Sequence, residues 1–136
     1  MPQLCDPFDP HPARDASLRS MEAVEAGDRN GWLALFAPDA LVEDPIGESP
    51  LDPSGEGHRG PEAIAAFYDM VIGPNEVRFR IDQSWAAGNE VANVGTITTT
   101  MGDGTVVHTD GVFTYRVNSG GKVTALRAYW EMSRLR

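Results

Sequence analysis

The amino-acid sequence predicts a single α+β domain in which a curved antiparallel sheet wraps around helices. Apolar residues recur at helical spacing in the first half of the chain, whereas from residue 77 onward they alternate with polar residues. Glycine-rich turns at 102–104 and 118–121 divide this second half into hairpins. Helices followed by a run of hairpin-connected strands are typical of an α+β fold.

Composition and charge limit the classes of partner. The chain has 136 residues, enough for one hydrophobic core, with 41% hydrophobic and 23% charged residues. A formal net charge of −9 disfavours phosphate backbones, so no nucleic-acid partner is expected. No apolar run is long enough to span a membrane, and the N-terminal residues lack a signal-peptide pattern. One cysteine permits no intrachain disulfide and fits a cytoplasmic protein.

The N-terminal residues predict an arm followed by two helices. Residues 1–13 are expected to form a flexible arm because four prolines interrupt them, and the domain then spans 14–136. Helical spacing predicts a first helix over 14–26. A second helix is capped by Asp28 and ended by Pro38. Its predicted inner face carries Trp32, Leu35 and Phe36.

Asp44 occupies an unusual position in the strand predicted next. The alternation places Asp44 on the same face as Ala40 and Val42. A carboxylate on an apolar strand face is unfavourable unless it is paired or used chemically. Burial raises a carboxyl pKa, and a general base works best with a pKa near the operating pH. Asp44 is therefore a candidate base, and the alternative is a structural carboxylate that accepts hydrogen bonds from the following loop.

A long polar loop and a third helix follow. Residues 47–60 are rich in glycine, proline and serine, and a loop of this length is often the lid or rim of a site. Pro61 suits the first turn of the next helix. The apolar stripe of that helix is Ile64, Phe67, Tyr68 and Val71. Alternation then predicts strands near 77–82, 90–101, 105–117 and 122–133.

Other chemistries lack their sequence motifs. The three histidines are scattered without metal-ligand spacing, so no metal and no cofactor are expected. The sequence also has no G-x-S-x-G motif and no phosphate-binding glycine loop between strand and helix. Tyr68 and Trp130 could each offer a hydrogen-bond donor to a ligand, although such side chains more often belong to a core.

Several segments resemble the Δ5-3-ketosteroid isomerases of the nuclear transport factor 2-like (SnoaL-like) superfamily. The resemblance rests on the Glu-Asp-Pro strand end within 42–47, the Ala-Phe-Tyr helix within 64–68 and residues 121–130. Residues 28–40 also fit, and the match covers about 15–133. It implies a cystatin/NTF2-like fold, with a curved antiparallel sheet that encloses a conical pocket, and a homodimer as the expected assembly.

The resemblance also implies roles for individual residues. Asp44 matches the general base, which moves a proton from the carbon between carbonyl and alkene to the far end of a dienolate. Ketosteroid isomerases hold the oxyanion with a tyrosine and a protonated aspartic acid. The residues implied to form the substrate site are Ser20, Phe36, Tyr68, Phe113, Tyr115, Ala128 and Trp130. Among them, Tyr68 matches a tyrosine that lies behind the contact residues, and Trp130 matches an aromatic that lines the steroid pocket.

Two positions depart from the family pattern. Ser20 stands where the family has its oxyanion tyrosine, and serine is too short to replace a phenol. The position of the protonated acid falls on Gly111, next to Asp110. Asp110 is the second candidate catalytic residue, but it faces outward unless a bulge at Gly111 turns it into the pocket.

Three functions follow from these residues. The first is a steroid Δ-isomerase with Asp44 as base, weakened because loss of one oxyanion donor costs on the order of 10²–10³ in rate. The second is a non-catalytic protein that binds a steroid or another hydrophobic small molecule. The third, a polyketide cyclase- or epoxide hydrolase-like enzyme, is disfavoured because Arg127 lies on the opposite strand face from Trp130 and completes no Asp–Arg–Asp set. The expected partner is a steroid-like small molecule, with no membrane.

Overall fold

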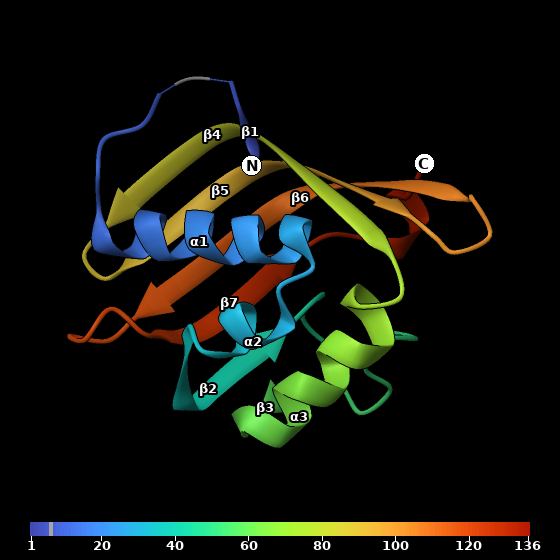
Figure 1. Cartoon of the computed structure of the whole chain (residues 1–136), viewed down its shortest axis with the longest axis horizontal. Coiled ribbons are helices and arrows are strands. Elements are labelled where there is room, and N and C mark those ends of the chain that lie inside the picture. Colours follow the sequence, from blue (N-terminus) through green and yellow to red (C-terminus); the bar gives the residue numbers. More distant parts are fainter. Residues whose placement is uncertain (6) are drawn as a thin grey trace.

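The computed structural model describes residues 1–5 and 7–136, which form a curved seven-stranded sheet around helices (Figure 1). The strand order is β1-β4-β5-β6-β7-β2-β3. The predicted α+β fold is confirmed, and its meander consists of four consecutive antiparallel strands. These strands are β4 (Glu76–Ala87), β5 (Glu90–Thr100), β6 (Val106–Val117) and β7 (Val123–Tyr129).

The outer part of the sheet contains parallel pairs that the sequence did not predict. β2 (Phe36–Glu43) runs parallel to β7, and β1 (Gln3–Leu4) runs parallel to β4. β3 (His58–Arg59) pairs with β2 in antiparallel orientation. Parallel neighbours need a long crossover connection, which the third helix and the meander supply between β2 and β7. The sheet is therefore mixed at its edges and antiparallel in its centre.

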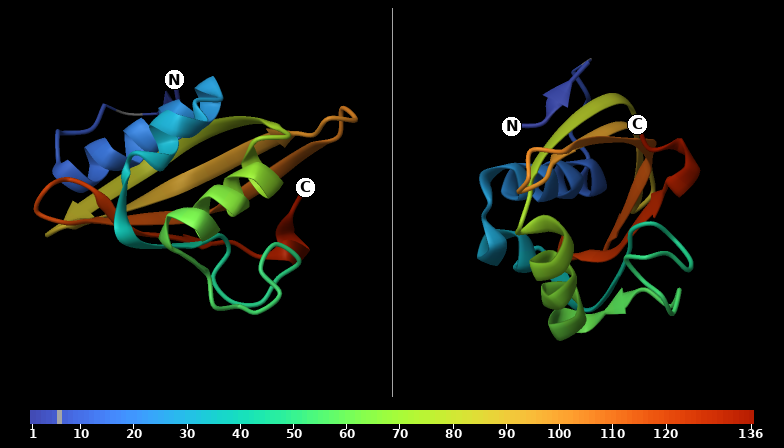
Figure 2. Two further views of the ribbon diagram at one scale, coloured as in Figure 1. Left: turned by 60° about the horizontal axis from the view of Figure 1, so that its bottom comes forward. Right: turned by 90° about the vertical axis from the view of Figure 1, so that its right-hand side faces the viewer.

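Two parts of the predicted N-terminal arm have regular secondary structure. Within residues 1–13, β1 pairs with β4, and the Cys5 amide donates to the Ile81 carbonyl at 3.0 Å. The first helix, α1 (Pro12–Ala26), begins two residues early because proline at the first helical turn lacks only an amide that has no partner inside the helix. Buried Arg14 on α1 donates to the Ser84 hydroxyl of β4 at 2.9 Å, which fixes the helix against the inner face of the sheet (Figure 2).

The second helix is shorter than predicted. α2 covers Arg29–Leu33, and the Asp28 carboxylate caps it by accepting from the Gly31 amide at 3.0 Å. The chain enters β2 at Phe36, so this residue belongs to a strand instead of a helix. The third helix forms as predicted in α3 (Gly60–Phe67) and continues as a π-helical turn over Tyr68–Ile72.

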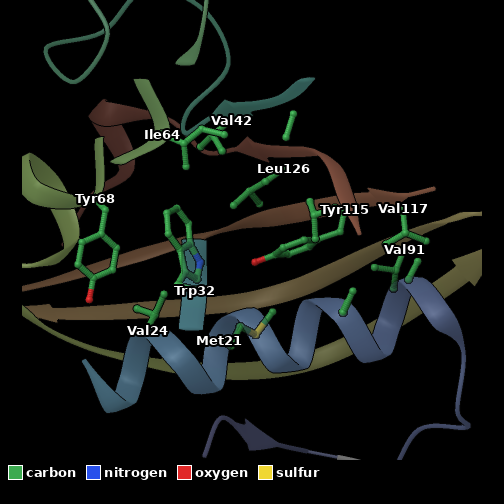
Figure 3. Close-up of a cluster of buried hydrophobic side chains, with 14 of the residues drawn as sticks. Met21, Val24, Trp32, Val42, Ile64, Tyr68, Val91, Tyr115, Val117 and Leu126 are labelled. Atoms are coloured by element: carbon green, nitrogen blue, oxygen red, sulfur yellow. The ribbon is translucent and has the colours of Figure 1, made fainter. Parts of the chain in front are cut away.

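The hydrophobic core lies between the helices and the concave face of the sheet. Figure 3 shows side chains from α1, α2, α3 and the sheet converging around Trp32 and Tyr115. Trp32 and Met21 are each 1% exposed, and Val42 is fully buried. The last strand stops at Tyr129, and a short 3₁₀ turn at Met132–Arg134 follows it. Among the described residues, no helix has the length and apolar character needed to cross a bilayer.

Candidate active site

A cavity of about 320 Å³ opens inside the curved sheet. Its mouth carries the half-exposed side chains of Met70, Met101 and Met132. Its wall is largely apolar, and Ser20 and Trp32 are almost completely buried in it. A concave, mostly apolar pocket with a few placed polar groups is the usual form of a small-molecule site, and such pockets typically measure ~300–1,000 Å³.

Asp44 lies on the wall of this cavity, one residue after the end of β2. The alternation of β2 buries Ala40 and Val42 completely and directs Asp44 to the same side. The Trp130 indole N–H donates to Asp44 Oδ1 at 2.6 Å. Two residues further on, the Ile46 amide donates to the Ala128 carbonyl at 3.1 Å. The first bond holds the Asp44 carboxylate against the segment after β7, and the second holds the backbone that follows Asp44 against β7.

The surroundings of Asp44 favour its neutral form. Burial raises the pKa of Asp44, while the hydrogen bond from Trp130 and the nearby His58 imidazole lower it by a smaller amount. His58 Nε2 is buried without a hydrogen-bond partner among the described residues, and the ring packs 4.8 Å from that of Phe67. A carboxylate with a raised pKa at the wall of an apolar cavity has the properties of a general base.

We expect Trp130→Phe to raise the pKa of Asp44 further. The indole hydrogen bond stabilises the carboxylate over the carboxylic acid, and phenylalanine keeps the aromatic volume but removes the donor. A ¹³C NMR titration of the Asp44 carboxyl carbon measures the change. Trp85→Phe is the matched control, because that indole is 69% exposed and bonds to Gln83. Equal titration midpoints in both variants would show that the Trp130 bond does not stabilise the carboxylate.

A second group of polar side chains lies on the same cavity wall. The Trp32 indole N–H donates to Ser20 Oγ at 3.0 Å, and Ser20 Oγ lies 2.9 Å from the Tyr115 hydroxyl. These residues come from α2, α1 and β6, and all three line the cavity. Burial raises the pKa of Tyr115, the bond to Ser20 lowers it, and the charge of Asp44 raises it. The phenol therefore keeps its proton and lies within electrostatic range of Asp44.

The structure does not bring Asp110 into the cavity. Asp110 is exposed on the outer face of β6, where Thr96 Oγ1 donates to it at 2.6 Å and Arg136 Nε at 3.0 Å. These two partners lower the pKa of Asp110 to about 2. The register between β5 and β6 is regular through Gly111, so no bulge turns Asp110 inward, and its expected catalytic position is corrected.

Gly111 leaves no room for an acid at the neighbouring position. A Cβ atom there would lie 2.5 Å from the Tyr129 carbonyl oxygen and 3.0 Å from Trp130 Cβ. The end of β7 thus passes directly against the backbone of β6. This close approach places Trp130 within hydrogen-bond distance of Asp44, so glycine serves the geometry of the candidate base.

The substrate-contact residues implied by the sequence separate into two groups. Ser20, Phe113, Tyr115 and Trp130 lie on the cavity wall together with Asp44. Phe36 and Ala128 lie outside the cavity wall, which corrects their expected contact with the substrate. Tyr68 also lies outside the wall, where the resemblance implies a supporting tyrosine. The rings of Phe36 and Tyr68 pack against that of Trp32, with ring centroids 4.6 Å and 5.4 Å apart. Both side chains therefore support the wall from behind.

Sequence reasoning missed three features of the site. Helical spacing predicts only the helix face on which Trp32 lies, because its bond to Ser20 depends on the angle between two helices. His58 stood in a polar loop with no motif, although β3 pairs it with Val42 near Asp44. The methionines of the mouth belong to three separate segments.

In the described part of the chain, no group of three His, Cys, Asp or Glu side chains is placed to hold a metal ion.

The chain is similar to known proteins in both sequence and fold. The SnoaL-like domain family matches residues 18–126. A steroid Δ-isomerase of Nocardioides simplex is 33% identical over 116 residues, which cover 85% of this chain and 86% of that protein. The crystal structure of a Δ5-3-ketosteroid isomerase from Mycobacterium sp. is 46% identical with a TM-score of 0.89, covering 92% of this chain and 97% of that one. A Mycobacterium tuberculosis protein in complex with estradiol-17β-hemisuccinate is 38% identical with a TM-score of 0.89, covering 93% and 99%.

Proposed function

Because the chain belongs to the SnoaL-like domain family, we propose that it is a steroid Δ-isomerase with Asp44 as its base. The observation that carries the proposal is the Asp44 carboxyl, whose pKa burial raises, on the wall of an apolar cavity of about 320 Å³. The substrate class is a Δ5-3-ketosteroid or a similar polycyclic ketone. The protein is expected to act in the cytoplasm as a homodimer.

The reaction is an intramolecular proton transfer without change of oxidation state. Asp44 removes a proton from the carbon between the carbonyl and the alkene, and the C–H electron pair becomes part of a dienolate. Protonated Asp44 then returns the proton to the far end of the dienolate, and the carbonyl and a conjugated alkene form. The hydrogen bond from Trp130 restricts the orientation of the carboxylate at the cavity wall. The apolar wall, including Phe113, excludes water from the reacting atoms.

Turnover of a Δ5-3-ketosteroid by the purified protein tests this function. We expect the ultraviolet absorbance of the conjugated enone to increase with time in proportion to protein concentration. Comparison with free carboxylate buffer gives the rate enhancement due to the folded site. Absence of any protein-dependent increase, with the protein folded and the steroid bound in a calorimetric titration, would refute the isomerase proposal.

Steroid binding without chemistry is the second candidate function. Ser20 at the family's tyrosine position favours it, because the expected oxyanion donor is absent there. The similar Mycobacterium tuberculosis structure contains a bound steroid derivative. This alternative predicts calorimetric binding of a phenolic steroid together with no turnover, whereas the isomerase predicts both.

A further inference from the structure

The site contains a candidate for the missing oxyanion donor, formed by residues that come together only in the fold. Ser20 Oγ lies between the Trp32 indole nitrogen at 3.0 Å and the Tyr115 hydroxyl oxygen at 2.9 Å. In Figure 3 the Tyr115 hydroxyl and the Trp32 indole nitrogen point toward one another across the cavity wall. All three residues line the cavity that also holds Asp44.

The direction of the two hydrogen bonds follows from the chemistry of the donors. An indole N–H can only donate, so Ser20 Oγ accepts from Trp32. Ser20 then has one proton of its own, and the Tyr115 oxygen is the other atom within hydrogen-bond distance among the described residues. If Ser20 donates to Tyr115, the hydrogen bonds run from Trp32 to Ser20 to Tyr115, and the phenol proton remains free to bond to a ligand.

The opposite arrangement is less suited to an oxyanion. If Tyr115 donates to Ser20, the ligand would have to accept from the serine hydroxyl, which already accepts from two groups. In the same buried surroundings a phenol is a stronger donor than an aliphatic hydroxyl, because its ordinary pKa of ~10 lies far below that of an alcohol. Tyr115 and Asp44 also line the same cavity, so one ligand can meet both the phenol and the base.

We propose that Tyr115 is a catalytic residue that donates a hydrogen bond to the enolate oxygen, and that Ser20 and Trp32 are its positioning residues. This inference rests on the proposed isomerase function, and it supplies from β6 a donor that the first helix lacks. Consecutive hydrogen bonds polarise one another, so the bonds from Trp32 to Ser20 and from Ser20 to Tyr115 make the phenol a better donor. No proton leaves Tyr115 in the reaction, because the phenol only stabilises the charge that develops on the oxygen.

A phenolic steroid tests the donor independently of turnover. Equilenin carries a naphthol oxygen that imitates the dienolate, and its absorbance reports the ionised fraction of the bound ligand. In an Asp44→Asn background, we expect Tyr115→Phe to weaken equilenin binding roughly 10- to 100-fold, the usual effect of one hydrogen bond to a charged oxygen. The ionised fraction should fall as well. The 3-deoxy analogue should bind both variants equally, because it cannot accept the bond.

Three comparisons make the experiment decisive. Tyr129→Phe is the matched control, because that tyrosine is 51% exposed and absent from the cavity wall. Ser20→Ala and Trp32→Phe should lower the ionised fraction less than Tyr115→Phe, as expected for residues that act through the phenol. A larger loss from Ser20→Ala than from Tyr115→Phe would assign the donor to Ser20 and overturn the proposal.

The outcomes separate this inference from the proposed function. In the wild-type background, Tyr115→Phe should reduce kcat on the order of 10²–10³-fold with little change in KM. If the wild-type protein has no turnover but equilenin binding still depends on Tyr115, the isomerase proposal fails and the donor assignment stands. If the Asp44→Asn protein does not prefer equilenin to its 3-deoxy analogue, the donor assignment is wrong even where turnover is observed.

Discussion

Asp44→Asn is expected to reduce isomerase turnover by about 10²–10⁴-fold, the usual contribution of a general base. The amide cannot accept a proton from carbon at neutral pH. It can still accept the Trp130 N–H bond through its oxygen, so the geometry of the cavity is kept. Initial rates of enone formation, compared between the variant and the wild-type protein at saturating steroid, measure the effect.

The same substitution is expected to stabilise the folded protein at neutral pH. Burial raises the pKa of Asp44 in the folded state above its ordinary value of 3.8. As the pH rises above the unfolded pKa, the unfolded chain releases this proton first, and the free energy of unfolding of the wild-type protein falls. The asparagine amide carries no charge at any pH, so Asp44→Asn should raise the thermal midpoint at pH 7 and leave it unchanged near pH 3.

Asp110→Asn is the matched control for both effects. Asp110 lies outside the cavity, and Arg136 and Thr96 hold its pKa at about 2 in the folded state. A lowered pKa contributes stability above the unfolded pKa, and this contribution is lost as the pH falls toward 2. Asp110→Asn should therefore leave turnover unchanged and give no stabilisation at pH 7. Equal thermal midpoints for wild type and Asp44→Asn across the whole pH range would contradict the buried position of the Asp44 carboxyl.

The alternation of a single strand was enough to predict how Asp44 is oriented. Ala40, Val42 and Asp44 share one face because successive side chains of a strand point to opposite sides. Glu43 lies on the other face and is paired with Arg127 at 2.8 Å. The same rule placed Asp110 on the outer face, and the regular register of β5 and β6 keeps it there.

The rest of the site depends on contacts between segments that are distant in the sequence. Helical spacing placed Trp32 on the inner face of α2, but its bond to Ser20 requires the turn at Gly27 to fold α2 back against α1. The Tyr115 hydroxyl reaches Ser20 across 95 residues of sequence. No local pattern encodes such a meeting, because it depends on the curvature of the sheet and on the parallel pairing of β2 with β7.

Gly111→Asp, which introduces an acid at the position expected from the family, should destabilise the protein instead of rebuilding an oxyanion hole. The new Cβ atom would lie 2.5 Å from the Tyr129 carbonyl oxygen, and backbone must move to relieve the contact. Overpacking of this kind typically costs ~1–3 kcal/mol, and desolvation of the new carboxylate adds to the cost. Chemical denaturation with urea measures the loss in the free energy of unfolding.

Gly111→Ala separates the steric effect from the charge. The alanine Cβ meets the same carbonyl oxygen, so this variant should lose stability as well, whereas Gly102→Ala should not, because a Cβ at Gly102 has no atom within 4 Å. The movement of β7 should also separate Trp130 from Asp44 and shift the carboxyl titration upward, as Trp130→Phe does. A stable Gly111→Asp variant with faster turnover would mean that β7 yields easily at Tyr129. The acid would then reach the cavity, and the close backbone approach would have no part in holding Trp130 against the base.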